Sequence, residues 1–341
     1  MKLAERRRLG RSEVCVPPLG FGGAALGNLY EPVSEPIARA TVERALSLGV
    51  THFDTAPYYG YGLSEERLGR ALPSARRSEW TVSTKVGRLL APRAHGPRQD
   101  QGFVDANAFD PVFDYGYDGV MRSFESSLVR LAVDRIDVLL LHDVGAMTHG
   151  DRHPETFETA MQGGYRAMTE LREAGVVGAV GLGVNETTVC IEALERVQLD
   201  CVLLAGRYTL LEQAALDDLL PACERCETSL IVGGPFNSGV LVEPRGESSH
   251  YDYAAAPSEI LTRVDRLATI CSRYAVPLAA VALQFPLHHP AVAGVIPGGR
   301  SPEEVEAHAR WVACDIPADL YDELRADGLI DPRAPTASAA A

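Results

Sequence analysis

Short apolar segments alternate with longer amphipathic segments along nearly the whole chain, and this alternation restricts the possible folds more than any other feature. Eight short runs read as strands covered by helices, because each is mainly apolar on both faces. These runs are Pro18–Gly22, His52–Asp54, Thr81–Thr84, Val138–His142, Gly178–Gly183, Cys201–Leu204, Leu230–Gly233 and Val292–Ile296.

Between these runs, apolar residues recur at three- and four-residue spacing and predict helices. The predicted helices are Glu35–Leu48, Glu66–Leu72, Tyr117–Leu131, Pro154–Ala174, Thr188–Val197, Glu212–Arg225, Ser258–Tyr274, Leu278–His288, Pro302–Val312 and Asp319–Asp327. Alternating strands and helices imply parallel strands joined by right-handed crossovers. Eight such units fit a (β/α)₈ TIM barrel in a chain of 341 residues.

An open, doubly wound α/β sheet is the rival fold. Its glycine-rich phosphate turn would follow the first strand and lead straight into a helix. The nearest match is GFGGAA, from Gly20 to Ala25, but Gly27, Asn28 and Pro32 interrupt any helix there. The barrel is therefore the favoured fold.

The remaining segments fit the periphery of one barrel domain over residues 1–330. Residues Arg6–Pro17 predict a hairpin that plugs the bottom of the barrel. Arg88–Asp118 and Phe236–Pro257 are too long to be plain connections, and long loops rich in aromatic residues usually carry function, although a self-packed surface loop is the alternative. The low-complexity residues 331–341 are expected to be a disordered tail.

The charge balance argues against some partners. A net charge of −14 disfavours nucleic acid and anionic membranes. Neither a membrane-length apolar run nor a signal peptide is apparent, so a cytoplasmic location is expected. Seven irregularly spaced cysteines fit reduced thiols, and no metal site is expected, because the pairs Cys223/Cys226, His288/His289 and His149/His153 lack further ligands or suitable geometry.

Four polar residues lie at or just after consecutive predicted strands. Asp54 ends the second strand, Tyr59 follows in the next turn, Lys85 ends the third strand, and His142 ends the fourth. Taken singly, each also fits a structural role such as a turn cap, a solvated charge or a core side chain. In a barrel, however, all four would meet at the carboxyl-terminal face, where barrel enzymes carry their active sites.

These four side chains form a chemically coherent set. A tyrosine hydroxyl has a pKa near 10, and a neighbouring ammonium such as that of Lys85 favours its ionised form. A carboxylate keeps the ammonium charged and oriented, and a histidine across the pocket positions a substrate oxygen. Such a tuned acid–base group suits alcohol–carbonyl redox chemistry.

The motifs around these residues, FDTAPYYG, STKVG and LLLHD, resemble those of the aldo-keto reductases from about Arg8 to about Leu324. The resemblance implies a (β/α)₈ barrel that binds NAD or NADP without a Rossmann unit. It also implies that Asp54, Tyr59, Lys85 and His142 are the catalytic residues.

The resemblance implies a cofactor site as well, with several departures. Asn185 is retained, but Val184, Ala205 and Gly233 replace residues that usually contact the nicotinamide. The implied cofactor residues are Gly22, Asn185, Phe236, Asn237, Ser238, Gly239, Pro297, Gly298, Gly299, Arg300, Ser301, Glu304 and His308. Glu304 stands where relatives that prefer NADP often carry a basic residue, which predicts a preference for NAD.

The same departures resemble the aldose 1-dehydrogenase branch, which includes dehydrogenases of D-threo-aldoses, L-fucose and L-galactose and a pyridoxal 4-dehydrogenase. The expected reaction takes a hydride from C1 of a sugar, with Tyr59 as general base, and yields a lactone. Pyridoxal oxidation, broad aldehyde or ketone reduction and, more remotely, a non-catalytic nicotinamide-sensing barrel are the alternatives. The expected substrate residues are Tyr58, Arg88, Phe113, Tyr115, Tyr117 and Arg207. The sequence leaves the oligomeric state open.

Overall fold

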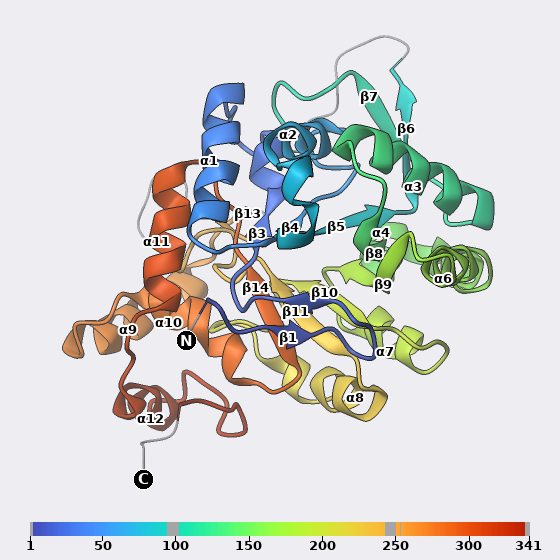
Figure 1. Cartoon of the computed structure of the whole chain (residues 1–341). Helices are drawn as coiled ribbons and strands as arrows, with labels where there is room; N and C mark the ends of the chain where they lie inside the picture. Colours follow the sequence, from blue (N-terminus) through green and yellow to red (C-terminus); the bar gives the residue numbers. More distant parts are fainter. Residues whose placement is uncertain (1–2, 94–101, 243–249, 253, 338–341) are drawn as a thin grey trace.

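The computed structural model describes residues 3–93, 102–242, 250–252 and 254–337 (Figure 1). Within them, eight parallel strands form one sheet, and every predicted strand is confirmed. The strands are β3 (Phe21–Gly22), β4 (His52–Asp54), β5 (Thr81–Val86), β8 (Ile136–His142), β9 (Val177–Val184), β10 (Cys201–Ala205), β11 (Ser229–Gly233) and β14 (Val292–Ile296).

The sheet closes on itself between its first and last strands. Leu19 pairs with Val295 and Gly22 with Gly298, both in parallel orientation. The Gly22 amide donates to the Pro297 carbonyl over 2.9 Å. A Cβ atom on Gly22 would lie 3.0 Å from the Ile296 carbonyl oxygen, so a residue without a side chain permits this close approach. The closed parallel sheet, surrounded by helices, is the expected (β/α)₈ barrel (Figure 1).

Helices surround the barrel where periodicity predicted them. The main ones are α1 (Glu35–Ser47), α2 (Leu63–Ala71), α3 (Tyr117–Leu131), α5 (His153–Thr159), α6 (Tyr165–Glu173), α7 (Thr188–Leu194), α8 (Leu219–Cys226), α9 (Ser258–Arg273), α10 (Leu278–Gln284), α11 (Pro302–Val312) and α12 (Ala318–Ala326). A short helix, α4 (Ala146–His149), precedes α5.

Two predicted helices differ in detail. The continuous helix expected at Pro154–Ala174 is divided by a π-helical turn at Ala160–Gly164. There Gly163 approaches the Tyr117 amide so closely that an added Cβ would lie 2.8 Å from its nitrogen. The helix expected from Glu212 starts only at Leu219, which leaves Pro221 in the first turn, where a missing amide costs no internal hydrogen bond.

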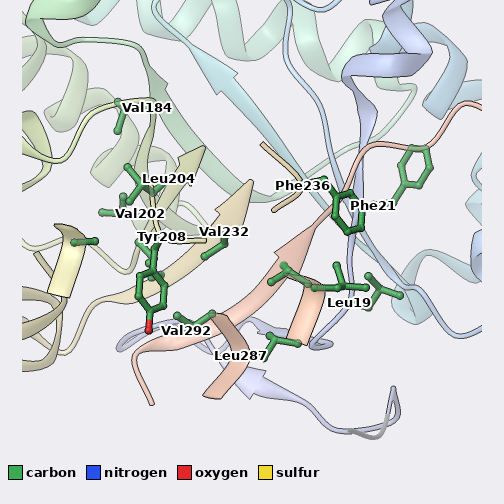
Figure 2. Close-up of a cluster of buried hydrophobic side chains, with 14 of the residues drawn as sticks. Leu19, Phe21, Val184, Val202, Leu204, Tyr208, Val232, Phe236, Leu287 and Val292 are labelled. Atoms are coloured by element: carbon green, nitrogen blue, oxygen red, sulfur yellow. The ribbon is translucent and has the colours of Figure 1, made fainter. Parts of the chain in front are cut away.

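Alternating residues of each strand face opposite sides of the barrel wall. On β10, Cys201 and Leu203 point into the barrel interior with Val138, Leu140 and Ile231. Val202 and Leu204 belong to the larger apolar cluster on the other face of the strand (Figure 2). Burying each such aliphatic side chain contributes roughly 1.5–3 kcal/mol, and the two layers together hold the strand ends in fixed positions.

The predicted amino-terminal hairpin is confirmed. Strands β1 (Arg7–Arg8) and β2 (Cys15–Val16) pair in antiparallel orientation. Leu9 and Val16 are buried within the same apolar cluster as the inward-facing side chains of the barrel strands. The hairpin therefore closes the amino-terminal end of the barrel, opposite the end where the candidate residues lie.

Loops cover part of the carboxyl-terminal end. Strands β6 (Arg88–Pro92) and β7 (Phe109–Phe113) form an antiparallel hairpin after β5, and the short strands β12 (His250–Tyr251) and β13 (Ala254–Ala255) pair after β11. The segment at residues 102–105 lies on the segment at residues 28–30. The Tyr30 amide donates to the Gly102 carbonyl, and the Val104 amide donates to the Asn28 carbonyl.

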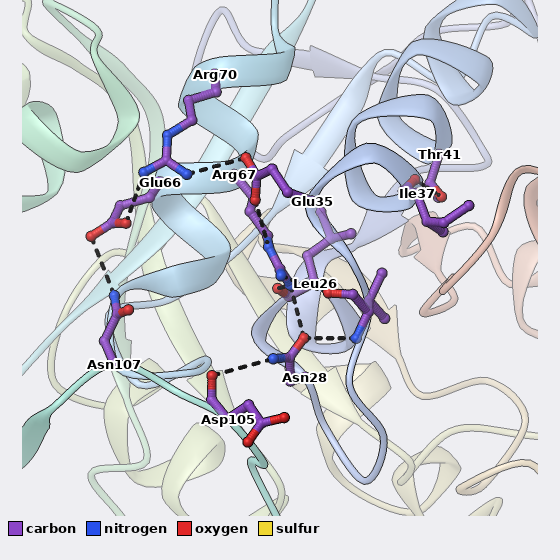
Figure 3. A network of polar contacts seen from close by, with 11 residues as sticks. Leu26, Asn28, Glu35, Ile37, Thr41, Glu66, Arg67, Arg70, Asp105 and Asn107 are labelled. Atoms are coloured by element: carbon purple, nitrogen blue, oxygen red, sulfur yellow. Dashed lines mark hydrogen bonds and ion pairs between the residues drawn. The ribbon is translucent and has the colours of Figure 1, made fainter.

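A buried guanidinium organises the loop between β3 and α1 (Figure 3). Arg67 of α2 donates to the carbonyl oxygens of Leu26 and Val33, each over 2.6 Å, and to the Asn28 side-chain oxygen over 2.8 Å. The Asn28 side chain in turn donates to the Asp105 carbonyl over 3.4 Å. Arg67 thus fixes the loop on which the segment at residues 102–105 lies.

The end of the described chain packs on the fold rather than fraying. Ala334 is buried, and Arg325 of α12 donates to the Ala334 carbonyl and to the Thr336 hydroxyl. The predicted tail covers residues 331–341, of which residues 338–341 lie outside the described residues. No single helix in the described part of the chain is long and apolar enough to span a membrane. Helix α9 and the segment Leu278–His288 reach that length and apolar character only when taken together, and they are bent by 102° relative to each other.

Candidate active site

The strand register brings three of the four candidate side chains to one edge of the barrel. Asp54 ends β4, Lys85 is next to last in β5, and His142 ends β8, and these three strands are consecutive neighbours in the sheet. Tyr59 comes from the following loop, whose backbone contacts the loop after β3 where Gly27 and Gly60 meet. The predicted cluster of Asp54, Tyr59, Lys85 and His142 therefore exists in space.

Lys85 lies at the centre of this cluster. Its ammonium donates to Asp54 Oδ2 over 2.7 Å, to the Thr55 carbonyl over 2.8 Å and to the Tyr59 hydroxyl over 3.1 Å. The Lys85 side chain is 1% exposed and runs past Gly183, where a Cβ would lie 3.1 Å from its Cε. All three donor positions of the ammonium are used, so its place is fixed.

The protonation states follow from burial and from these contacts. Burial raises the pKa of Tyr59 above its usual value, and Lys85 offsets only part of this effect. Burial by itself lowers the pKa of Lys85, but Asp54 and Tyr59 together raise it above its usual value. Burial thus outweighs the effect of Lys85 that was expected to favour the phenolate: Tyr59 is protonated at neutral pH beside a charged Lys85.

Asp54 is held from the other side by residues that sequence reasoning missed. The Ser83 hydroxyl donates to Asp54 Oδ1 over 2.7 Å, and the His52 ring lies 3.5 Å from Ser83 Oγ and 2.9 Å from Thr81 Oγ1. Burial lowers the pKa of His52 to about 4, so this ring is neutral. The two-residue period of neighbouring strands β4 and β5 was the signal that could have revealed this second layer.

His142 stands across the opening from Lys85. Its ring centroid lies 6.1 Å from those of Tyr58 and Tyr59, with the planes at 74° and 89°. Burial, together with the positive charges of Arg88 and Lys85, lowers the pKa of His142 well below its usual value. Within the described residues, its buried Nδ1 has no hydrogen-bond partner. A neutral ring in this position can donate one hydrogen bond to a substrate oxygen.

Aromatic rings and an arginine form the wall beside His142. The Arg88 guanidinium lies over the Tyr58 ring at 4.2 Å and over the Phe113 ring at 5.1 Å, and it pairs with Asp143. Phe103 contacts the rings of Tyr58 and Tyr59 at 5.4 and 6.2 Å. Asp143 and Phe103 were not among the expected site residues; both contacts depend on how loops fold back over the barrel.

Two expected substrate residues lie behind the wall or outside it. Tyr115 is buried, and its hydroxyl donates to the His142 carbonyl over 2.6 Å, so it supports the strand end. Tyr117 was also expected in the pocket, and its position in the structure differs from that of the other five residues. It begins α3, its hydroxyl donates to Glu170 of α6, and Arg166 lies over its ring. The start of the helix turns this side chain toward the exterior.

Asn185 and Arg207 lie just after the next two strands, β9 and β10. The Asn185 side-chain nitrogen lies 3.3 Å from Asp143 Oδ1, and the backbone carbonyl of Asn185 accepts from Arg207 Nε over 2.8 Å. Arg207 also pairs with Asp252 at 2.8 Å. Arg207, one of the six expected substrate residues, is therefore held by two neighbouring segments.

The loop after β11 has an unusual backbone. Asn237, Ser238 and Gly239 have consecutive positive φ values of 46°, 62° and 102°. The Asn237 side chain accepts from Thr209 Oγ1 over 2.6 Å and donates to the Gly206 carbonyl over 3.2 Å. Such strain in non-glycine residues persists where surrounding bonds enforce it and is concentrated at ligand sites.

The segment after β14 leads into the start of α11. Ser301 is the N-cap, and its side chain accepts from the Glu304 amide over 3.3 Å. The Glu304 carboxylate accepts from the Arg300 amide over 2.8 Å. Arg300 Nε is buried and has no partner in the described part of the chain. Phe236 of the preceding loop stacks near His308 of α11 with centroids 5.5 Å apart.

These features fit a dinucleotide along the edge from Gly22 to Ser301. A helix start and the buried Arg300 Nε, which has no partner among the described residues, suit phosphate oxygens, and Gly22 pairs with Gly298 without an intervening side chain. Among the described residues, no group of three or more His, Cys, Asp or Glu side chains could hold a metal ion.

Comparisons with known proteins agree with this geometry. The model of the aldo/keto reductase family matches residues 18–326. The chain is 45% identical over 340 residues to pyridoxal 4-dehydrogenase of Microbacterium luteolum, covering 97% of this chain and 99% of the relative. It is 39% identical over 323 residues to D-threo-aldose 1-dehydrogenase of a Pseudomonas species, covering 93% and 95%. The holo form of an aldo-keto reductase from Bacillus halodurans superposes with a TM-score of 0.72 at 27% identity, covering 96% of each chain.

Proposed function

Because the chain belongs to the aldo/keto reductase family, we propose that it is an NAD(P)-dependent dehydrogenase that oxidises the hemiacetal carbon of a cyclic substrate to a lactone. The observation that carries this proposal is the contact of Tyr59 with the fixed ammonium of Lys85, opposite the neutral His142. This arrangement supports a reaction in which Tyr59 is the proton acceptor and His142 the hydrogen-bond donor for one substrate oxygen.

Two substrate types share the proposed chemistry. An aldose in its ring form carries a hemiacetal at C1. Pyridoxal carries an aldehyde beside a hydroxymethyl group and closes to a cyclic hemiacetal in the same way. Relatives named for each type match this chain over at least 93% of its length. The flat faces of Tyr58 and Phe113, bridged by Arg88, suit a planar pyridine ring as well as the apolar face of a sugar. Pyridoxal and aldoses are therefore proposed as members of one substrate class.

In the forward step, the nicotinamide supplies the hydride acceptor. Tyr59 takes the proton of the hemiacetal hydroxyl, and the charge of Lys85 stabilises the phenolate that must exist just before this transfer. Asp54 holds Lys85 in place, and His142 orients the substrate oxygen as it becomes a carbonyl. Since burial raises the pKa of Tyr59, oxidation requires loss of its proton before each turnover.

We further propose that NAD is preferred over NADP. The Arg300 amide fixes the Glu304 carboxylate at the start of α11. A carboxylate there repels the 2′-phosphate on the adenosine ribose that distinguishes NADP from NAD. Side-by-side kcat/KM values for the two nucleotides test this, and comparable values would disprove it.

The test of the function is a substrate panel followed at the NADH absorbance band. Pyridoxal, L-fucose, L-galactose, D-arabinose and simple aldehydes are compared with both nucleotides, and the product is identified as a lactone by mass spectrometry. We expect lactone from pyridoxal, from at least one aldose, or from both. Turnover of simple aldehydes alone, with no hemiacetal oxidised, would favour broad aldehyde reduction. Nucleotide binding without any turnover would favour the non-catalytic sensor.

A further inference from the structure

The residue after His142 folds back beside it. Consecutive side chains of a strand point to opposite faces, so Asp143 would be expected to point away from His142. Instead, Asp143 has a φ of 48°, a conformation that few residues other than glycine, asparagine and aspartate adopt. Its amide donates to the Gly183 carbonyl over 2.9 Å, which fixes the bend. The carboxylate consequently lies 3.4 Å from His142 Nε2.

Both oxygens of this carboxylate have further partners. Asp143 Oδ2 pairs with Arg88, and Oδ1 lies 3.3 Å from the Asn185 side-chain nitrogen. The side chains of Arg88 and Asp143 are only 8% and 12% exposed. Arg88 is held in turn between the rings of Tyr58 and Phe113. The carboxylate is therefore locked from three sides next to one ring nitrogen of His142.

The two ring nitrogens of His142 have different surroundings. Nε2 faces an anionic carboxylate, whereas the buried Nδ1 has no partner among the described residues. A buried N–H without an acceptor is rarer in proteins than an acceptor without a donor. A proton on Nε2 and a lone pair on Nδ1 therefore fit these surroundings better than the reverse arrangement.

We propose that Asp143, held by Arg88, is a positioning residue whose charge beside Nε2 keeps the proton of His142 on this nitrogen, from which it is donated to the substrate oxygen. The proposal rests on the proposed function for the substrate, but the tautomer is a property of the protein alone. Asp143 acts through His142 and does not itself touch the reacting atoms.

Several charged and titratable groups face this pair from the surrounding elements. Lys85 of β5 and Arg88 of β6 act on both His142 and Asp143, and the charge of Asp143 acts on the pKa of neighbouring phenols. The facing groups are Tyr58, Tyr59, Lys85, Arg88, Tyr115, His149 and Asn185.

Asp143→Asn is the central variant. Asparagine tolerates positive φ and keeps the shape of the side chain, so the bend is retained while the charge is lost. We expect kcat to fall by about 10-fold or more, with KM changed much less, as for other carboxylates that fix the tautomer of a catalytic histidine. Asp114→Asn is the matched control, because it also removes a carboxylate that pairs with an arginine, in this case Arg122. The control should keep wild-type kcat.

The pH profile separates positioning from a purely structural role. Arg88→Gln removes the cation that keeps Asp143 ionised and His142 neutral, so kcat/KM should acquire a loss at acidic pH. Arg88→Lys restores the charge and should remove much of that loss. The double variant Arg88→Gln/Asp143→Asn, which has no carboxylate to protonate, should show a smaller loss at acidic pH than Arg88→Gln. Profiles of equal shape in all variants would overturn the proposal.

Nitrogen NMR of protein labelled with ¹⁵N-histidine tests the tautomer without any substrate. The His142 signals are assigned by their absence from His142→Gln. We expect a protonated Nε2 in the wild type and a mixture or the Nδ1–H form in Asp143→Asn. A wild type with the proton on Nδ1, or an unchanged tautomer in Asp143→Asn, would refute the positioning role. Because this measurement needs no turnover, it stands apart from the outcome of the substrate panel.

Discussion

The ammonium of Lys85 donates to the hydroxyl of Tyr59 over 3.1 Å, from a position that Asp54 and the Thr55 carbonyl also fix. Tyr59 is partly exposed, whereas Lys85 is buried. The phenol proposed to transfer the proton is therefore partly accessible, while the charge beside it is buried.

Tyr59→Phe removes the hydroxyl and keeps the ring that packs against Phe103 and His142. Because acid–base groups contribute about 10²–10⁴-fold, we expect kcat to fall by at least about 100-fold with little change in stability. Steady-state turnover and thermal unfolding, measured on the same preparation, check both parts. Turnover close to that of the wild type would rule out Tyr59 as the acid–base group.

Lys85→Met should abolish most activity and also destabilise the fold. It leaves the carboxylate of Asp54 buried without its cation, a change that costs about 3–5 kcal/mol in comparable buried pairs. Adding Asp54→Asn removes that unpaired charge, so the double variant should regain part of the stability and none of the activity. Urea unfolding reports the first quantity and turnover the second; a single variant as stable as the wild type would contradict the expectation.

The rate of oxidation should rise with pH from neutral to alkaline solution. The pKa of Tyr59 is raised above its usual value near 10 by burial, so only a small fraction is ionised at pH 7. If proton loss from Tyr59 limits the step, kcat/KM increases by up to about tenfold per pH unit. The reverse reaction, in which Tyr59 donates its proton, should not show this rise. A flat oxidation profile between pH 7 and 9 would count against Tyr59 as the base.

Stability should fall as the pH decreases from about 6.5 toward 5. Burial lowers the pKa of His52 and of His308 to about 4, so the unfolded chain takes up protons near 6.5 while the folded chain does not. The resulting stability is complete above pH 6.5 and is lost at lower pH, by about 2 kcal/mol for each such buried ring at pH 5. Urea unfolding at pH 7.5 and 5 measures the loss, and His52→Asn should reduce it. Equal free energies of unfolding at the two pH values would refute this.

Tyr117→Phe should leave KM and kcat unchanged, because its hydroxyl is bonded to Glu170 on the outside of the barrel. Phe113→Ala is the informative partner variant, since it removes one of the two rings that hold Arg88, and we expect KM for ring substrates to increase. A clearly raised KM for Tyr117→Phe would indicate that Tyr117 does contact the substrate.

The strands and the cluster of Asp54, Lys85 and His142 could be predicted because they follow from local patterns. Strand ends can be read from the sequence, and parallel strands bring their ends to one edge. The helix boundaries at Leu219 and Ala160 were harder to predict from the sequence. The position of Pro221 decides the first, and a close approach between two distant backbone segments decides the second.

Asp143 illustrates what the sequence did not reveal. It was visible within LLLHD, but strand alternation places it on the opposite face from His142, and only the bend at φ 48° brings the two together. Phe103 depends in the same way on a loop that lies on another loop. The net pKa of Tyr59 depends on how completely the folded loops exclude water, which the presence of Lys85 in the sequence could not show.

The pairing of residues 28–30 with residues 102–105 has a consequence for engineering. The two segments exchange backbone hydrogen bonds, and the first is anchored from below by Arg67. A loop grafted alone from another barrel would arrive without its matching partner and would misplace Phe103. Transplanting both segments together, with Arg67 that supports them, is the smallest exchange that preserves the wall. The two loops must therefore be exchanged together rather than one at a time.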